Sequence, residues 1–321
     1  MKESEWIEKL LAPLAGKPAL GLCDDAAILP KLENEEWIVS TDALLEGVHY
    51  PKGLGGKDIA RRLIASNLSD LAAKGARPKG YFLTFIANMP DKEAQAFVRV
   101  LEAYQQQLGW ELWGGDSVSG DIPMFSLTVF GTVPYGKMIK RSTAKEGDSV
   151  FVSGTIGDAY IGRLMIEGKI KDQNAFLKQR FLQPTPRNGL GEALIDLAHS
   201  AIDISDGLLA DIGKIALSSN VEIELRKDAI PISSFAKKYI ENGKGVDALL
   251  RAGDDYEIAF TIDPHRKEEA FRLAKMHETD IHEIGQVTKA TKAPSLSIGG
   301  KVYKLANGGA AGLGYQHILS L

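Results

Sequence analysis

The sequence has little cysteine, no excess of basic charge and no long apolar run. Cys23 is the one cysteine among 321 residues, which excludes an internal disulfide and suits a reducing compartment. The 38 basic and 42 acidic residues leave a net charge of -4, so no basic surface for nucleic acid is indicated. No apolar stretch approaches the roughly 20 residues that cross a bilayer. These absences predict a cytoplasmic protein that binds small molecules, without nucleic acid or membrane partners.

The familiar nucleotide-binding motifs are also missing. Gly55-Gly56-Lys57 resembles the end of a P-loop, but Asp58 stands where a Ser or Thr is required and Pro51 where the first glycine is needed. No G-x-G-x-x-G follows a predicted strand and opens a helix, and the H-R-D and D-F-G pair of protein kinases does not occur. If this protein binds ATP, a different fold holds the nucleotide.

The length of the chain predicts two domains, because 321 residues exceed the size at which a single core keeps growing. Small and charged residues at 141–148 mark the change of composition, and we place the boundary near residue 145. The predicted domains are therefore residues 1–145 and 146–321. Strands and helices are interspersed in both, which predicts an α+β fold with two mixed sheets, each covered by helices.

Hydrophobic periodicity predicts the individual elements. Residues 1–11 are acidic and amphipathic, as in an ordinary first helix. The predicted strands are 37–40, 81–86, 125–133, 149–154, 201–204 and 256–262. The other predicted helices are 58–74, 158–168, 173–182, 187–199 and one that begins at 208. Gly299-Gly300 predicts a hairpin near the end of the chain.

What the sequence does contain is a series of acidic motifs beside glycine, serine or threonine. They are C-D-D at 23–25, S-T-D at 40–42, N-L-S-D at 67–70, G-G-D at 114–116, D-I-S-D-G at 203–207 and G-D-D-Y-E at 253–257. Several follow or interrupt apolar runs, where a carboxylate is costly unless a cation or a hydrogen-bond donor meets it. Magnesium is usually held by a few carboxylates that share it with substrate phosphates. The series therefore predicts a magnesium and phosphate site.

Single motifs also have plainer interpretations. Asn67, Asp70 and Lys74 fall on one polar stripe of the predicted helix 58–74, and such a stripe can be solvent-facing surface. Its amide, hydroxyl and carboxylate content favours a site instead. Asp206 precedes a predicted helix and can be its N-cap or, with Ser205 beside it, part of a ligand site at the helix N-terminus.

In order and spacing, these motifs and Arg141-Ser142 resemble the thiamine-monophosphate kinase family over nearly the whole chain. That family belongs to the superfamily of aminoimidazole ribonucleotide synthetase and selenophosphate synthetase. The resemblance implies a two-domain PurM-like architecture, with an N-terminal ATP- and metal-binding domain whose strands pair with a second subunit in a homodimer. It also implies a phosphotransferase that converts ATP and thiamine monophosphate to ADP and thiamine diphosphate.

The resemblance further implies roles for individual residues. The implied ligands for several magnesium ions are Asp25, Ser40, Thr41, Asp42, Asp70, Asp116, Asp203 and Asp206. The implied ATP contacts are Tyr104, Gly115, Asp116, Arg141 and Ser205. The implied contacts to thiamine monophosphate are His49, Asp254 and Tyr315. No general base is expected, because the acceptor is an ionised phosphate monoester, so we predict direct in-line transfer driven by positioning and charge neutralisation.

Three positions depart from the family pattern, and three other functions stay open. Cys23 and Ala252 stand where the family usually has glycine, and Asp254 stands where it usually has glutamate. Selenophosphate synthetase would need a nucleophilic cysteine upstream of the Asp24-Asp25 pair, and none is present. Aminoimidazole ribonucleotide synthetase would need a glycine and aspartate motif after the first strand, which is not seen. A non-catalytic relative would be expected to lose a central carboxylate, whereas every one is present.

Overall fold

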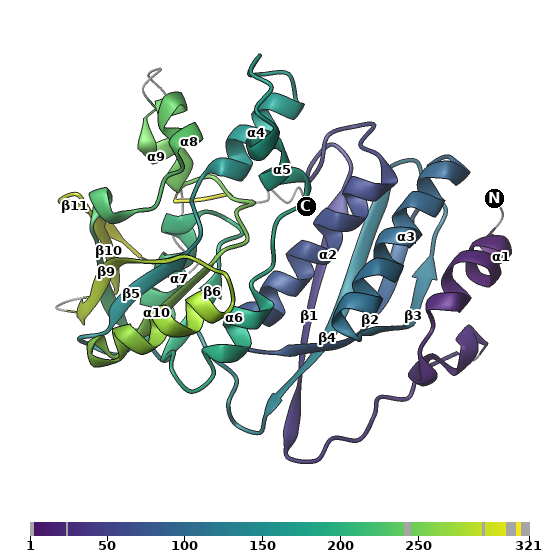
Figure 1. The fold of residues 1–321 in the computed structure, drawn as a ribbon, viewed down its shortest axis with the longest axis horizontal. Coiled ribbons are helices and arrows are strands. Elements are labelled where there is room, and N and C mark those ends of the chain that lie inside the picture. Colours follow the sequence, from purple (N-terminus) through teal and green to yellow (C-terminus); the bar gives the residue numbers. More distant parts are fainter. Residues whose placement is uncertain (1–2, 24, 241–244, 291–292, 306–312, 316–321) are drawn as a thin grey trace. The chain divides into compact units, whose positions relative to one another are not determined.

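The computed structural model describes residues 3–23, 25–240, 245–290, 293–305 and 313–315 (Figure 1). It divides into two compact units. The first comprises Met1–Leu71 and Ala76–Gly136, and the second comprises Ala72–Gly75 and Lys137–Leu321. Each unit contains a mixed β-sheet with helices, so the predicted α+β class is confirmed. The boundary near residue 145 and the roles of the two halves stay predictions.

The first unit is built on a four-stranded sheet in the order β1-β4-β2-β3. Strands β1 (Glu35–Leu45), β4 (Met124–Pro134) and β2 (Arg77–Ile86) are antiparallel neighbours, and β3 (Glu111–Ser117) runs parallel to β2. Helices α2 (Gly56–Ala73) and α3 (Asp91–Leu108) cover one face of this sheet (Figure 1). Leu63, Phe97 and Leu127 are fully buried between these helices and strands. This burial of apolar surface is the main stabilising contribution in the unit.

The other face of the four-stranded sheet carries aromatic side chains. Trp37 lies edge-on to Trp113 at a centroid distance of 5.6 Å, and Phe130 is 5.3 Å from both Trp113 and Phe82. Val39, on the same face of β1 as Trp37, is 53% exposed. This face therefore presents apolar surface that the described part of the unit covers only partly.

The second unit contains a seven-stranded sheet in the order β11-β10-β7-β9-β5-β8-β6. Its strands are β5 (Ser149–Ser153), β6 (Ser200–Asp203), β7 (Val221–Leu225), β8 (Ile258–Ile262), β9 (Ile281–Lys289), β10 (Ser295–Ile298) and β11 (Lys301–Lys304). Alternate residues of β5 face opposite sides, because Val150 and Val152 pack with helix α7 (Leu208–Ser219). Phe151 packs instead with residues of α6 (Asn188–Ala193) and α10 (Lys267–Met276). Helices thus cover both faces of this sheet.

Shorter elements complete the two units. Helix α1 (Glu3–Trp6) continues as a π-helix over Ile7–Leu11 and is followed by 3-10 turns over Ala12–Leu14 and Lys17–Leu22. The second unit adds α4 (Asp158–Ile166), α5 (Ala175–Leu182), α8 (Ser234–Tyr239) and α9 (Val246–Leu250), with 3-10 turns at Lys227–Ala229 and Pro264–Arg266. Within the described residues, no helix is long and apolar enough to span a membrane.

Most predicted elements are confirmed with shifted ends. The predicted strand 37–40 extends over Glu35–Leu45, and the hairpin at Gly299-Gly300 joins β10 to β11. The predicted helix 187–199 is shorter, because α6 ends at Ala193. Helix α2 ends at Ala73 rather than at Lys74, since Gly75 follows with a φ of 73° that reverses the chain.

Candidate active site

Four polar residues of the first unit form a hydrogen-bonded group, which we call the Asp70 cluster: Ser40, Asp42, Asn67 and Asp70. The Ser40 hydroxyl donates to the carboxylate of Asp70. The Asp42 backbone N–H donates to Asn67 Oδ1 at 3.0 Å, and Asn67 Nδ2 donates to the Leu63 carbonyl at 2.8 Å. Ser40 and Asp42 lie two residues apart and share one face of β1. The cluster therefore brings two carboxylates from β1 and α2 to the same side of the sheet.

The polar stripe predicted on the helix is not a solvent-facing surface. Asn67 and Ser69 have an exposed fraction of 0%. Asn67 and Asp70 bind the Asp42 backbone and the Ser40 hydroxyl of β1. A fully buried amide must have partners, and Asn67 has them on both its oxygen and its nitrogen. Lys74 does not belong to the stripe, since it lies after the end of α2 and donates to the Ala201 carbonyl of the second unit's sheet at 2.8 Å.

Thr41 points away from the Asp70 cluster. Its hydroxyl donates to the Leu127 carbonyl at 3.0 Å and lies 3.1 Å from the hydroxyl of Thr128. Because adjacent strand residues face opposite sides, Thr41 lies on the face of β1 that Ser40 and Asp42 avoid. Its predicted role as a magnesium ligand stays a prediction.

Gly115 and Asp116 lie near the end of β3, paired with Leu83 and Thr84 of β2. A Cβ atom on Gly115 would lie only 1.9 Å from the Leu83 carbonyl oxygen, so the close pairing of these strands requires glycine there. The Leu83 side chain is buried on the face of the sheet that the helices cover. Asp116 is paired with the next residue, Thr84, which faces the opposite side. By this register, Asp116 projects from the other face of the sheet than Asp42.

The remaining predicted residues of the first unit lie outside the Asp70 cluster. Asp25 is exposed in the segment before β1, and Asp24 lies outside the described residues. Tyr104 is half-buried near the C-terminal end of α3. His49 Nδ1 accepts the Leu45 backbone N–H at 3.0 Å, so the neutral ring carries its proton on Nε2.

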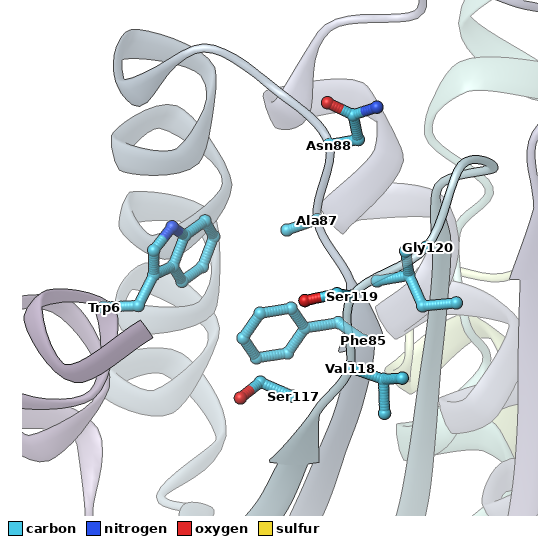
Figure 2. A pocket seen from close by; sticks show the side chains of 9 residues that line it. Trp6, Phe85, Ala87, Asn88, Ser117, Val118, Ser119 and Gly120 are labelled. Atoms are coloured by element: carbon cyan, nitrogen blue, oxygen red, sulfur yellow. The ribbon is translucent and has the colours of Figure 1, made fainter. Parts of the chain in front are cut away.

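A recess of about 310 Å³ opens at the ends of β2 and β3 (Figure 2). Its wall includes Trp6 and Phe85, whose rings lie 5.0 Å apart, together with Asn88, Ser117 and Ser119. Ser117 directly follows Asp116, so the recess continues the strand end that carries two predicted nucleotide contacts. No residue that lines this recess was among the predicted site residues.

In the second unit, the loop 204–207 between β6 and α7 is held by a buried carboxylate. Asp211 Oδ2 accepts the backbone N–H groups of Ser205, Asp206 and Gly207 at 3.0, 3.0 and 3.1 Å. The N-cap residue of α7 is Gly207, with a φ of 119°, so the N-cap interpretation of Asp206 is wrong. Asp211 therefore occupies the backbone N–H groups of the three residues that precede α7.

Lys214 connects this buried carboxylate to Asp206. Its ammonium lies 2.6 Å from Asp206 Oδ2 and 2.7 Å from Asp211 Oδ1. Burial raises the pKa of Asp211 to about 6, although the charge of Lys214 opposes the rise. Burial lowers the pKa of Lys214, but Asp211 and Asp206 outweigh burial and raise that pKa above its ordinary value. Lys214 is therefore fully charged at neutral pH.

The predicted substrate residues of the second unit lie against the same loop. The Asp254 backbone N–H donates to the Ser205 carbonyl at 3.0 Å, and the Tyr315 N–H donates to the Asp206 carbonyl at 2.9 Å. Asp254 has a φ of 75°, and its carboxylate lies 3.8 Å from Arg163. Backbone hydrogen bonds thus bring Ser205, Asp206, Asp254 and Tyr315 together, and their roles in binding stay predictions. Arg141 is exposed, and its carbonyl accepts the Ser219 hydroxyl.

Sequence reasoning missed the buried ion group next to Asp254. Glu257, which is fully buried, accepts from Arg180 at 2.8 Å, from Arg187 at 2.7 Å with two nitrogens, and from Ser153 at 2.6 Å. Nothing in the spacing of these residues marks them as partners. The one available signal was the glutamate of the G-D-D-Y-E motif at the start of an apolar strand, where a charge needs a partner.

The carboxylates of the Asp70 cluster are candidate metal ligands. Among the described residues, no group of three or more His, Cys, Asp or Glu side chains lies close enough to hold a metal ion. The Asp70 cluster supplies two carboxylates and a hydroxyl, all oxygen donors of the kind that magnesium prefers. Such a set fits a magnesium ion whose remaining ligands are water and substrate phosphate oxygens.

Comparisons with known proteins match both halves of the chain. The family model for the AIR synthase related protein, N-terminal domain, matches residues 23–133, and that for the C-terminal domain matches residues 145–294. The thiamine-monophosphate kinase of Caulobacter vibrioides is 38% identical over 294 residues, 88% of this chain and 83% of that protein.

The chain is also similar to solved structures of thiamine-monophosphate kinases. Thiamine-monophosphate kinase from Stenotrophomonas maltophilia K279a has a TM-score of 0.81 and 35% identity, covering 90% of this chain and 94% of that one. AaThiL complexed with AMPPCP and TMP has a TM-score of 0.76 and 27% identity, with 88% of each chain covered.

Proposed function

This chain belongs to the AIR synthase related protein family and, within it, to the thiamine-monophosphate kinases, and we propose that it transfers the γ-phosphoryl group of ATP to thiamine monophosphate. The products are ADP and thiamine diphosphate. The observation that carries the proposal is that Ser40 binds the Asp70 carboxylate while Asn67 binds the Asp42 backbone, because these two bonds connect the N-L-S-D motif to the S-T-D motif. The relative AaThiL in complex with AMPPCP and TMP supports the same pair of substrates.

Asp42 and Asp70 are the residues we assign to magnesium first. When bound, magnesium neutralises the charge of the β- and γ-phosphates during transfer. The Ser40 hydroxyl orients one oxygen of Asp70, and Asn67 fixes the backbone of Asp42, so the Asp70 carboxylate and the Asp42 backbone are held before substrate arrives. Preorganised charge of this kind is the largest contribution to rate in phosphoryl transfer. For the other magnesium ions that the family resemblance implies, the proposed ligands are Asp25, Thr41, Asp116 and Asp203; Thr41 and Asp116 project from the other face of the sheet than Asp42.

The chain's other proposed contacts fall into two sets. Gly115 brings its backbone close to the nucleotide because no side chain intervenes, and Tyr104, Asp116, Arg141 and Ser205 complete the ATP contacts. His49, Asp254 and Tyr315 contact thiamine monophosphate. The acceptor phosphate is ionised at neutral pH, so these residues need only position it in line with the γ-phosphorus, and no phosphoenzyme forms.

We also propose that the protein is a cytoplasmic homodimer. The aromatic face of the four-stranded sheet supplies apolar surface for a second copy, because Val39 is exposed and Trp37 and Phe82 are only half-buried. Cys23 is a free, exposed thiol, which suits a reducing compartment. Sedimentation of the purified protein should give twice the monomer mass.

The direct test is detection of thiamine diphosphate after the purified protein is incubated with thiamine monophosphate, ATP and magnesium. Stoichiometric ADP and thiamine diphosphate are expected, with no label left on the protein when γ-labelled ATP is used. ADP released without thiamine diphosphate would contradict the kinase proposal. A burst of covalently labelled protein would contradict direct transfer while leaving the substrates unchanged.

Replacing Asp254 by asparagine is expected to raise the KM for thiamine monophosphate about tenfold or more, because one charged contact to the substrate is lost. Asparagine tolerates the left-handed φ of 75°, so the backbone should keep its shape. The change in kcat should stay within about threefold, as expected for a contact made equally in ground and transition states. The measurement is initial-rate kinetics with each substrate varied in turn.

The matched control is Asp247→Asn, which removes an exposed carboxylate of the same unit that lies 3.3 Å from Lys227. Its KM values should match those of the wild type. An unchanged KM for thiamine monophosphate in Asp254→Asn would show that Asp254 does not contact the substrate.

A further inference from the structure

The family resemblance implies that Asp206 binds a metal ion, but in this structure its carboxylate binds the ammonium of Lys214. Its ammonium lies 2.6 Å from Asp206 Oδ2, a distance typical of a strong charge-assisted hydrogen bond. The same ammonium lies 2.7 Å from Asp211 Oδ1. A single point charge thus bridges the two carboxylates of the loop and the first turn of α7, as a cation would.

Asp211 fixes Lys214 in this place. The side chain of Asp211 is 1% exposed, and its Oδ2 accepts three backbone N–H groups. The carboxylate is therefore fixed in position and cannot move with the ammonium of Lys214. Withdrawing the ammonium would leave a buried carboxylate without its charged partner, which is costly. Lys214 is itself only 30% exposed at its side chain and therefore gains little hydration by leaving.

A divalent cation at Asp206 would have to compete with this arrangement. The cation would bind the carboxylate that the Lys214 ammonium already contacts. Two positive charges on one carboxylate repel each other strongly in a partly buried site. Magnesium also gives up its water reluctantly, and one carboxylate shared with a lysine offers it little in return. The positive N-terminal end of α7 adds to the repulsion.

We propose that Lys214 is the resident cation of Asp206, so that Asp206 is not a metal ligand in this protein while Lys214 is present. The inference deepens the proposed function and rests on it, since it concerns which residues of that site hold metal. Lys214 is then a positioning residue, which holds Asp206 directly and the Ser205 backbone through Asp211, without a metal ion.

The test counts Mn²⁺ bound to the full-length protein by equilibrium dialysis with saturating AMPPCP present on both sides, because the nucleotide itself also binds Mn²⁺. The proteins compared are the wild type, Asp206→Asn, Lys214→Gln and the double variant. We expect the wild type and Asp206→Asn to bind the same number of ions with the same affinity. Lys214→Gln should bind one additional ion, and the double variant should lose it again.

Lys214→Arg is the conservative control, since it keeps the charge and should keep the wild-type ion count. Loss of one Mn²⁺ in Asp206→Asn would overturn the inference, and this variant leaves Lys214 and Asp211 in place if Lys214→Gln fails to fold. A folded Lys214→Gln that gains no ion would overturn it equally. A wild type that binds no Mn²⁺ with AMPPCP would instead contradict the proposed function, and the inference with it.

Discussion

Replacing Asp70 by asparagine is expected to lower kcat for thiamine diphosphate formation by about 100-fold to 1000-fold. The substitution keeps the shape of the side chain and its hydrogen bond to Ser40 but removes the negative charge proposed to hold magnesium. Losing one preorganised electrostatic contact in a phosphoryl-transfer site costs rate on this scale. The measurement is the rate of product formation at saturating ATP, thiamine monophosphate and magnesium.

Asp58→Asn is the matched control, because Asp58 lies in the first turn of the same helix and forms only a partly exposed ion pair with Arg61 at 3.7 Å. Its activity should remain within about twofold of the wild type, as expected for a surface ion pair. Both variants should unfold at the same temperature as the wild type to within a few degrees. Full activity in a folded Asp70→Asn would remove the Asp70 cluster from the proposed mechanism.

Replacing Glu257 by glutamine is expected to lower the free energy of unfolding by about 3–5 kcal/mol. The carboxylate is fully buried and is bound by Arg180 and Arg187, so the substitution leaves two guanidinium groups without their counter-charge. Ile204 donates its backbone N–H to the Glu257 carbonyl at 2.8 Å, so the loss should also loosen the loop that carries Ser205. Urea unfolding followed by circular dichroism measures the change.

Glu283→Gln is the comparison for this stability loss. Glu283 also contacts two basic residues, Lys267 at 2.8 Å and Arg226 at 3.9 Å, but its side chain is 28% exposed. Ion pairs in contact with water contribute little, so the expected loss is below about 1 kcal/mol. Equal losses of unfolding free energy in the two variants would show that burial does not determine how much the Glu257 ion group contributes to stability.

The same group predicts how stability depends on pH. Burial by itself raises the pKa of Glu257, but hydrogen bonding to Arg187 and the charge of Arg180 outweigh burial and hold the pKa below its ordinary value. A carboxyl whose pKa is lower in the folded state stabilises the fold above its unfolded pKa, near 4.5, and loses that contribution as pH falls through its folded pKa. Stability should therefore fall more steeply below about pH 4.5 in the wild type than in Glu257→Gln.

Asp255 affects the pH dependence of stability in the opposite direction to Glu257. Burial raises its pKa well above the ordinary value, so it takes up a proton in the folded state first and stabilises the fold as pH falls. The charge of Glu257 is one of the causes that raise the pKa of Asp255, so the difference between the wild-type and Glu257→Gln pH profiles reports Glu257 together with its effect on Asp255. Parallel profiles would contradict the charged state assigned to Glu257.

Local patterns in the sequence were sufficient to predict the strand that carries Asp42 and the helix that carries Asp70. The alternation of residues 125–133 likewise gave β4 within a residue at each end. Helix α3 was not among the predicted elements, although Asp91 and Glu93 in its first turn and the left-handed Gly109 at its end are ordinary helix signals. Helix α3 could therefore have been predicted from its local sequence.

Pairing over long separations could not be predicted in the same way. Nothing in Val221–Leu225 indicates that it pairs in parallel with Ser295–Ile298, because a strand pattern does not name its partner. The same limit applies to the site. The motif at 203–207 was identified, but its bonds to Asp211 depend on the backbone course through Gly207, which spacing alone does not fix.

The backbone hydrogen bonds of the loop 204–207 also affect the order in which the two groups of site residues can form during synthesis. The loop is bound by Asp254 and by Tyr315, both of which are synthesised long after it. The Asp70 cluster, in contrast, uses residues 40–70 and a sheet that is complete at Pro134. Because domains fold as their chain emerges, the carboxylates of the first unit can assume their final geometry while the loop of the second unit still lacks its partners.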